Sequence, residues 1–313
     1  ELLEGLPAEF HAPALLDLPG VASLSLLCAH QHRESALATL RAVMLRLLTS
    51  LPPAKARLTM IDPVGLGQSF AGFMRLADHD EKLVSSRIWT DPRHIEQRLA
   101  DLTEHMETVI QKYLRNEFDS IESYNAEAGE IAEPYRFLVI ADFPTGFSEE
   151  ACRRLTSILE SGPRCGVFTL IHADPNAKLP ETFHLEAITG AGGAVLRAKD
   201  SAGFSIDDGA LGLLPLKLEP APDEPVMADL LASVGAAART ADRVEVPFDR
   251  LAPQNGELWS GTAAEELRLP LGRAGATRHQ EIALGRGTSQ HALVAGKTGS
   301  GKSTLLHVLI TNA

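Results

Sequence analysis

The sequence is poor in the residues and runs that mark several large classes of protein. Its three cysteines, Cys28, Cys152 and Cys165, form no CxxC pair, and its eleven histidines show no zinc-ligand spacing. A disulfide framework and a zinc finger are therefore excluded. No run of about eighteen apolar residues occurs, so nothing predicts a membrane span within this chain. Buried free thiols are typical of a reducing compartment, and we expect a cytoplasmic protein whose membrane anchor, if it has one, lies outside this chain.

Positive charge and aromatic residues are also scarce. Lys and Arg number 29 against 41 Asp and Glu, and the net charge is −12. This balance argues against a nucleic-acid-binding surface over the whole chain, although a local basic groove remains compatible with it. Aromatics make up 5% and hydrophobic residues 44%, so the core of this 313-residue chain is mostly aliphatic. The length suits one large domain or two ordinary ones.

What the sequence does contain is a phosphate-binding loop near its end. The residues from Gly296 to Ser303 read GKTGSGKS, the pattern of nucleoside triphosphatases. Glycines let the backbone turn tightly around a polyphosphate, Lys302 can reach its β- and γ-phosphates, and the Ser303 hydroxyl can ligate Mg²⁺. We therefore predict that ATP and Mg²⁺ bind to the following residues: Gly296, Lys297, Thr298, Gly299, Ser300, Gly301, Lys302, Ser303 and Thr304.

The residues on both sides of the loop support this interpretation over a glycine-rich turn that binds nothing. The apolar run 292–295 predicts a buried parallel strand, and 304–310 predicts a helix whose positive end faces the anion. Hydrolysis also needs a second strand that ends in acidic residues, and none follows the loop before Ala313. We expect the chain to be a piece of a longer protein, and we expect it not to hydrolyse ATP by itself.

Strands and helices alternate through the earlier part of the chain. Apolar runs predict strands at 21–29, 56–61, 137–141 and 167–171, and helical spacing predicts helices after His30, after Asp91 and after Ser148. This order predicts an α/β fold with a mainly parallel sheet flanked by helices. We predict a first module over 1–222, a linker with a short helix over 223–250, and the beginning of a second module over 251–313.

The first module looks like a damaged copy of the second. Its first strand leads into AHQHRES, residues 29–35, which contains neither glycine nor lysine. Contact of His30, His32 and Arg33 with an anion is one interpretation, but we favour their being surface residues of a decayed site. At the third strand, either Ala141 and Asp142 replace an Asp-Glu pair, or Asp142 is kept and Phe143 replaces the Glu. One acid is lost in both alignments, so we expect the module to be inactive.

Taken together, these residues resemble the FtsK/SpoIIIE family of motor ATPases, which is related to HerA. The resemblance rests on HALVAGKTGSGKSTLL, on 269–273 before it, and in the first module on Ile61-Asp62-Pro63 and Thr90-Asp91-Pro92. It implies RecA-like P-loop modules, ATP at the subunit interfaces of a homo-oligomeric, usually hexameric, ring, and translocation of double-stranded DNA. Type VII secretion ATPases of the EccC kind are similar and move protein. A scaffold with vestigial ATPase modules is a further alternative.

Overall fold

A computed structural model describes residues 11–115, 117–181, 183–190, 192–199, 203–207, 209, 211–241, 246–252, 261–287 and 290–313. The chain forms two compact units. Residues 1–112 and 134–240 make the first unit, and residues 113–133 and 241–313 make the second.

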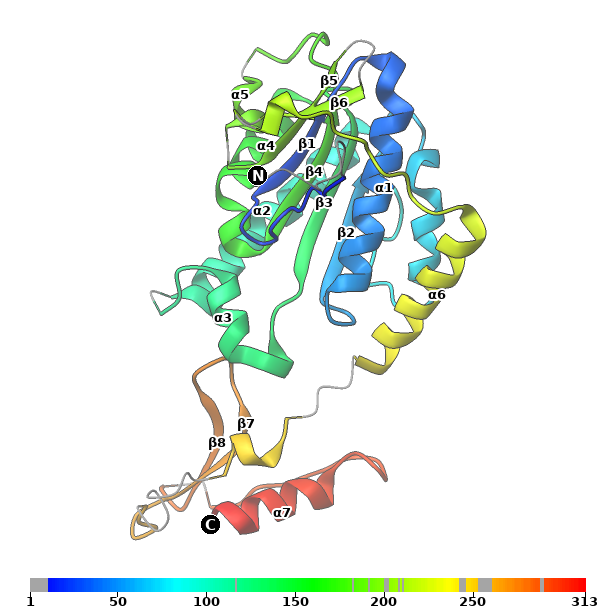
Figure 1. Ribbon diagram of the computed structural model, residues 1–313. Helices are drawn as coiled ribbons and strands as arrows, with labels where there is room; N and C mark the ends of the chain where they lie inside the picture. The colour runs from blue at the N-terminus through cyan, green and yellow to red at the C-terminus, as the bar shows by residue number, and fades with distance from the viewer. Residues whose placement is uncertain are drawn as a thin grey trace, which may run out of the picture. The chain divides into compact units, whose positions relative to one another are not determined.

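The first unit contains a six-stranded sheet in the order β2-β3-β4-β1-β5-β6. All its strand pairs are parallel except β5 with β6. Its strands are β1 (Ser23–Leu27), β2 (Ala56–Ile61), β3 (Tyr135–Phe143), β4 (Val167–Ala173), β5 (Ala194–Lys199) and β6 (Gly203–Ile206). Its α-helices are α1 (Arg33–Ser50), α2 (Pro92–Val109), α4 (Glu149–Ser161), α5 (Glu186–Thr189) and α6 (Glu224–Ala241). The predicted mainly parallel sheet flanked by helices is confirmed (Figure 1).

Local sequence signals explain where two of these helices begin. Asp91 accepts a hydrogen bond from the Arg93 backbone N–H at 3.0 Å, and Pro92 occupies the first turn of α2. Ser148 accepts one from the Ala151 N–H at 3.1 Å and caps α4. Both caps stand where the sequence predicts them. The apolar residues of α2 recur every three or four positions, so one face of the helix is buried.

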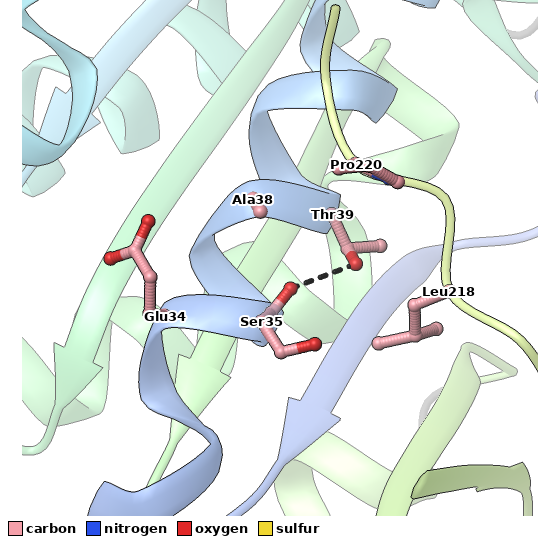
Figure 2. Close-up of a pocket in the computed structure, with 6 residues that line it drawn as sticks. All are labelled: Glu34, Ser35, Ala38, Thr39, Leu218 and Pro220. Carbon is pink, nitrogen blue, oxygen red and sulfur yellow. Dashed lines mark hydrogen bonds between the residues drawn. The ribbon is translucent and has the colours of Figure 1, made fainter.

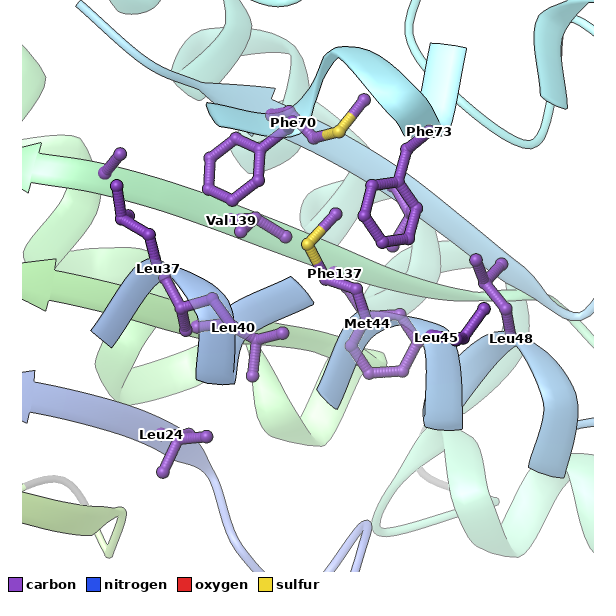
Figure 3. Packing of buried hydrophobic residues seen from close by; sticks show 14 of the residues in the cluster. Leu24, Leu37, Leu40, Met44, Leu45, Leu48, Phe70, Phe73, Phe137 and Val139 are labelled. Carbon is purple, nitrogen blue, oxygen red and sulfur yellow. The ribbon is translucent and has the colours of Figure 1, made fainter. Parts of the chain in front are cut away.

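The main core lies between α1 and one face of the sheet (Figure 3). Leu37, Leu40 and Met44 of α1 are fully buried in a cluster with Phe137 and Val139 of β3. A 3-10 segment, Gln68–Asp78, adds its buried phenylalanines Phe70 and Phe73. Each such side chain contributes roughly 1.5–3 kcal/mol relative to exposure. The three cysteines are buried free thiols, as predicted.

Helix α6 belongs to this core too, in the region where the sequence predicts a linker with a short helix. Its Leu231 and Ala238 are buried in the same cluster as α1. A methyl group on its Gly235 would lie 2.5 Å from the His79 ring, so glycine permits the close approach of the helix to that ring. The region 223–250 therefore contains a helix that packs on the first unit.

The second unit contains α3 (Ile121–Ala128), the antiparallel hairpin of β7 (Leu267–Arg273) and β8 (His279–Leu284), and α7 (Lys302–Asn312). The Arg273 guanidinium donates to the Ala128 carbonyl at 3.2 Å and to the Glu127 carbonyl at 3.1 Å. These are the last carbonyls of α3, which have no partner within the helix. A segment from the middle of the chain is thus part of the same unit as the phosphate loop. Within the described ranges, no helix is long and apolar enough to cross a membrane.

Candidate functional site: a phosphate loop and its closed counterpart

The predicted phosphate loop immediately precedes α7 in the second unit. Helix α7 begins at Lys302, after a turn in which Gly299 has φ of 80° and Gly301 has φ of 86°. Residues with side chains rarely adopt these angles. A Cβ atom on Gly296 would lie 2.4 Å from the Ser300 hydroxyl oxygen, so the Ser300 side chain would have to move. The shape of the turn therefore favours glycine at 299 and 301.

Lys302 closes the loop on itself. Its ammonium donates to the carbonyl oxygens of Gly296 and Lys297, at 2.8 Å each. The Ser303 and Thr304 side chains are exposed, and the first N–H groups of α7 have no acceptor within the helix. This end of the helix offers donors, partial positive charge and an exposed hydroxyl, which fits a polyphosphate with its Mg²⁺.

The strand predicted before the loop is not formed. Residues 291–297 have no regular secondary structure, and Leu293 and Val294 are 93% and 41% exposed. A strand needs a hydrogen-bonding neighbour, and none of the described residues provides one here. The predicted helix is confirmed and runs further, to Asn312. The Asn312 side-chain amide donates to the Pro270 carbonyl at 3.1 Å and so links α7 to β7.

The corresponding turn of the first unit lies at the carboxyl edge of its sheet. After β1, His30–His32 form a 3-10 turn, and α1 begins at Arg33. His30 is exposed, as expected for a surface residue. The same expectation is wrong for Arg33, whose side chain is only 19% exposed. Its Nε and Nη2 atoms donate to the two carboxylate oxygens of Asp142, at 2.6 Å each.

Asp142 reaches Arg33 because the end of β3 is irregular. The pairing of β3 with β4 shifts register between Ile140 and Phe143, and Asp142 has φ of 58°. Such a bulge redirects a side chain at the cost of local strain. Ala141 and Phe143 remain buried, so Asp142 alone of the three residues joins Arg33 at the edge. We could not predict this contact because it joins distant positions through a backbone irregularity.

Two further polar residues complete the edge. The Asp142 N–H donates to His172 Nδ1 of β4 at 3.2 Å, and His172 is 2% exposed. Asp62, which follows β2, is fully buried and lies 3.9 Å from Arg33 Nη2. Burial raises the pKa of the Asp142 carboxyl, but the contacts with His172 and Arg33 outweigh burial and lower the pKa to about 2. The carboxylate is therefore ionised at neutral pH.

A pocket near this edge is a poor alternative site for a phosphate (Figure 2). It has a volume of about 280 Å³ and lies between the first turns of α1 and the segment around Pro220. Its lining includes one carboxylate, that of Glu34, and no cationic side chain. Its Thr39 hydroxyl is already donated to the Ser35 carbonyl at 3.0 Å. In the part of the chain that the structure describes, no group of three or more acidic, His or Cys residues is arranged to hold a metal.

Solved structures share the fold over most of the chain. EssC from Geobacillus thermodenitrificans (ATPases 2 and 3) is 14% identical with a TM-score of 0.52, and the match covers 93% of this chain and 59% of that one. The cytoplasmic domain of the type VII secretion ATPase EccC from Thermomonospora curvata is 18% identical with a TM-score of 0.53, covering 93% and 39%. A structure of EccC ATPases 2 and 3 in complex with a signal sequence peptide is 18% identical with a TM-score of 0.50, covering 98% and 59%.

These identities show the fold alone, and this chain spans no more than 59% of the length of any of the three structures. A comparison with curated proteins gave no match. The sequence model of the FtsK/SpoIIIE family, in contrast, matches residues 38–192 and 228–313, which include much of the first unit and the whole phosphate loop. The chain therefore belongs to the FtsK/SpoIIIE family.

Proposed function

We propose that the second unit binds ATP with Mg²⁺ through residues 296–304, and that the full-length protein uses its hydrolysis to translocate a polymer. The observation that carries the proposal is the turn with positive φ at Gly299 and Gly301, directly before a helix that begins with Lys302 and Ser303. The loop amides and the end of α7 would hold the phosphates. Lys302 would exchange its two carbonyl contacts for charged phosphate oxygens, which are stronger acceptors.

The proposed load is double-stranded DNA, moved through a homo-oligomeric ring with nucleotide at its subunit interfaces. Family membership supports this choice. It does not require a basic surface over the whole chain, because the net charge of −12 leaves a local basic groove possible. We further propose a cytoplasmic location. The chain alone, from Glu1 to Ala313, should not hydrolyse ATP, because no complete acid and water-positioning set accompanies the loop.

A protein load is the second candidate. The observation that favours it is the similarity of fold to EssC and EccC over 93% of this chain, since EccC is a type VII secretion ATPase. One of the EccC structures holds a signal sequence peptide. A motor that moves protein would use the same phosphate chemistry and differ in what stimulates it.

Stimulated hydrolysis separates the two loads. The full-length protein is assayed with duplex DNA, with a signal sequence peptide and with neither. The proposal predicts several-fold stimulation by DNA and none by peptide, and the reverse pattern assigns the protein load. Lys302→Ala should remove both basal and stimulated hydrolysis, whereas the exposed Lys217→Ala should leave both unchanged. Undiminished turnover by the Lys302 variant would refute the assignment of the loop.

A further inference from the structure

The carboxyl edge of the first unit is occupied by its own cation. Arg33 Nη2 lies 2.6 Å from Asp142 Oδ2, 3.4 Å from the Ser69 hydroxyl oxygen and 3.9 Å from Asp62 Oδ1. Two carboxylates and a hydroxyl from three different segments thus surround one nitrogen atom. Oxygen atoms of this kind are the ligands that a divalent cation such as Mg²⁺ or Mn²⁺ prefers.

The same carboxylates are satisfied without any bound molecule. Both oxygens of Asp142 accept from Arg33. Those of Asp62 accept the N–H groups of Gly65 at 2.9 Å and Ser69 at 3.0 Å. The side chains are well shielded, because Asp142 is 10% exposed and Asp62 is fully buried. Carboxylates buried to this degree need a compensating positive charge, and Arg33 provides it.

Arg33 occupies the same position in its helix as Lys302 does in α7. Arg33 is the first residue of α1, as Lys302 is the first residue of α7. Asp142 ends a strand separated from β1 only by β4, from which His172 contributes its Nδ1. The first unit therefore keeps an acid at the edge where β1 leads into its helix, and it places a guanidinium on that acid.

We propose that Arg33 is a built-in substitute for a divalent cation at the carboxyl edge of the first unit. The guanidinium neutralises Asp142 and Asp62, so this edge keeps one arrangement whether or not nucleotide is present. The inference does not depend on what the second unit binds or on what the full-length protein moves. It implies that the two carboxylates become a site for a divalent cation once the guanidinium is removed.

Arg33→Met in the full-length protein tests this inference through thermal unfolding of the first unit, followed with EDTA and then with 5 mM Mn²⁺. In EDTA the variant should unfold about 5–10 °C below the wild type, because a shielded carboxylate has lost its partner. Mn²⁺ should restore at least half of that loss and leave the wild type within 1 °C. Arg197→Met is the matched control, since Arg197 pairs with Asp207 at 2.7 Å but both side chains are more than 40% exposed. It should shift unfolding by no more than about 2 °C, with no response to Mn²⁺.

Two further variants keep the test decisive. Arg33→Met with Asp142→Asn should lose the response to Mn²⁺, because one of the two carboxylates is gone. If Arg33→Met does not yield folded protein, Arg33→Lys should fold with a smaller loss and no Mn²⁺ response, since an ammonium still occupies the position. Unchanged unfolding of Arg33→Met in EDTA, or an equal Mn²⁺ response in the wild type and in Arg33→Met, would overturn the inference. So would a Mn²⁺ response that survives Asp142→Asn or that appears in Arg33→Lys.

Discussion

Lys302 and Arg33 each begin a helix, but they use their charge in opposite ways. Lys302 follows an exposed loop, and its ammonium donates to two carbonyl groups of that loop. Arg33 is largely buried and holds a carboxylate through two hydrogen bonds of 2.6 Å. An ammonium readily exchanges neutral carbonyls for phosphate oxygens. Separating Arg33 from Asp142, in contrast, would leave two shielded charges without a compensating partner. The comparison of Lys302 with Arg33 indicates that the partner of a cation decides whether a site is open to a ligand.

The largest expected effect comes from removing the cation of the open loop. Lys302→Ala in the full-length protein should lower ATP hydrolysis by on the order of 10²–10³, because a positive charge on the transferred phosphoryl group is lost. Steady-state turnover measures it, with Lys217→Ala as the control. Arg33→Lys, assayed in parallel, should retain near-normal turnover. If Arg33→Lys lost hydrolysis to the same extent as Lys302→Ala, the claim that only Lys302 of the two acts on the nucleotide would be wrong.

Acid should weaken the carboxyl edge of the first unit, where Asp142 lies. The ordinary pKa of 3.8 for Asp142 falls to about 2 in the folded protein. A lowered folded-state pKa stabilises the fold at pH values above about 4, and this stability is lost as the pH falls from about 4 to 2. The loss should amount to about 2 kcal/mol. Denaturant unfolding across this pH range measures it, and Asp142→Asn should flatten the acid limb by that amount. A limb of unchanged steepness would contradict the stabilisation of the Asp142 carboxylate by His172 and Arg33.

A substitution in the turn of the open loop should act on ligand binding. Gly301 has φ of 86°, so Gly301→Ala strains the turn by about 1–2 kcal/mol and should weaken ATPγS binding roughly tenfold. Isothermal titration of the full-length protein checks this value. Gly261→Ala is the control, because a Cβ at Gly261 meets no atom within 4 Å and its φ is not in the left-handed region. Equal affinities for the two variants would show that the shape of the turn does not matter.

The smallest expected effect concerns the segment that joins the second unit. Arg273→Met removes donors from the last carbonyls of α3, and each such hydrogen bond is worth about 1 kcal/mol. Amide hydrogen exchange at the end of α3 should accelerate about fivefold. Arg268→Met, which removes an exposed side chain paired with Glu266, should leave this rate unchanged. An unchanged exchange rate in Arg273→Met would show that these hydrogen bonds do not hold residues 113–133 in the same unit as the phosphate loop.

The features that the sequence predicts well are carried by neighbouring residues. The caps at Asp91 and Ser148 act within their own helices, and buried strands show as short apolar runs. The phosphate loop is also a contiguous motif, and its binding of ATP stays a prediction. The parallel sheet follows because strands alternate with helices.

The features that it does not predict depend on distant contacts. Arg33 and Asp142 are 109 positions apart, and they meet through an irregularity in β3 that the residue types at that place do not predict. The assembly of residues 113–133 with the β7–β8 hairpin likewise rests on Arg273 reaching carbonyls 145 and 146 positions away. The strand predicted at 292–295 fails for a related reason, because an apolar run becomes a strand only beside another strand.

Photo-crosslinking of an azido-ATP analogue to the full-length protein, with the labelled peptides identified by mass spectrometry, tests the contrast between the two helix starts most directly. We expect label in the peptide that contains Lys302, its loss in Lys302→Ala, and no label in the peptide that contains His30 and Arg33. Label near His30 that persists in Lys302→Ala, with none near Lys302, would contradict it.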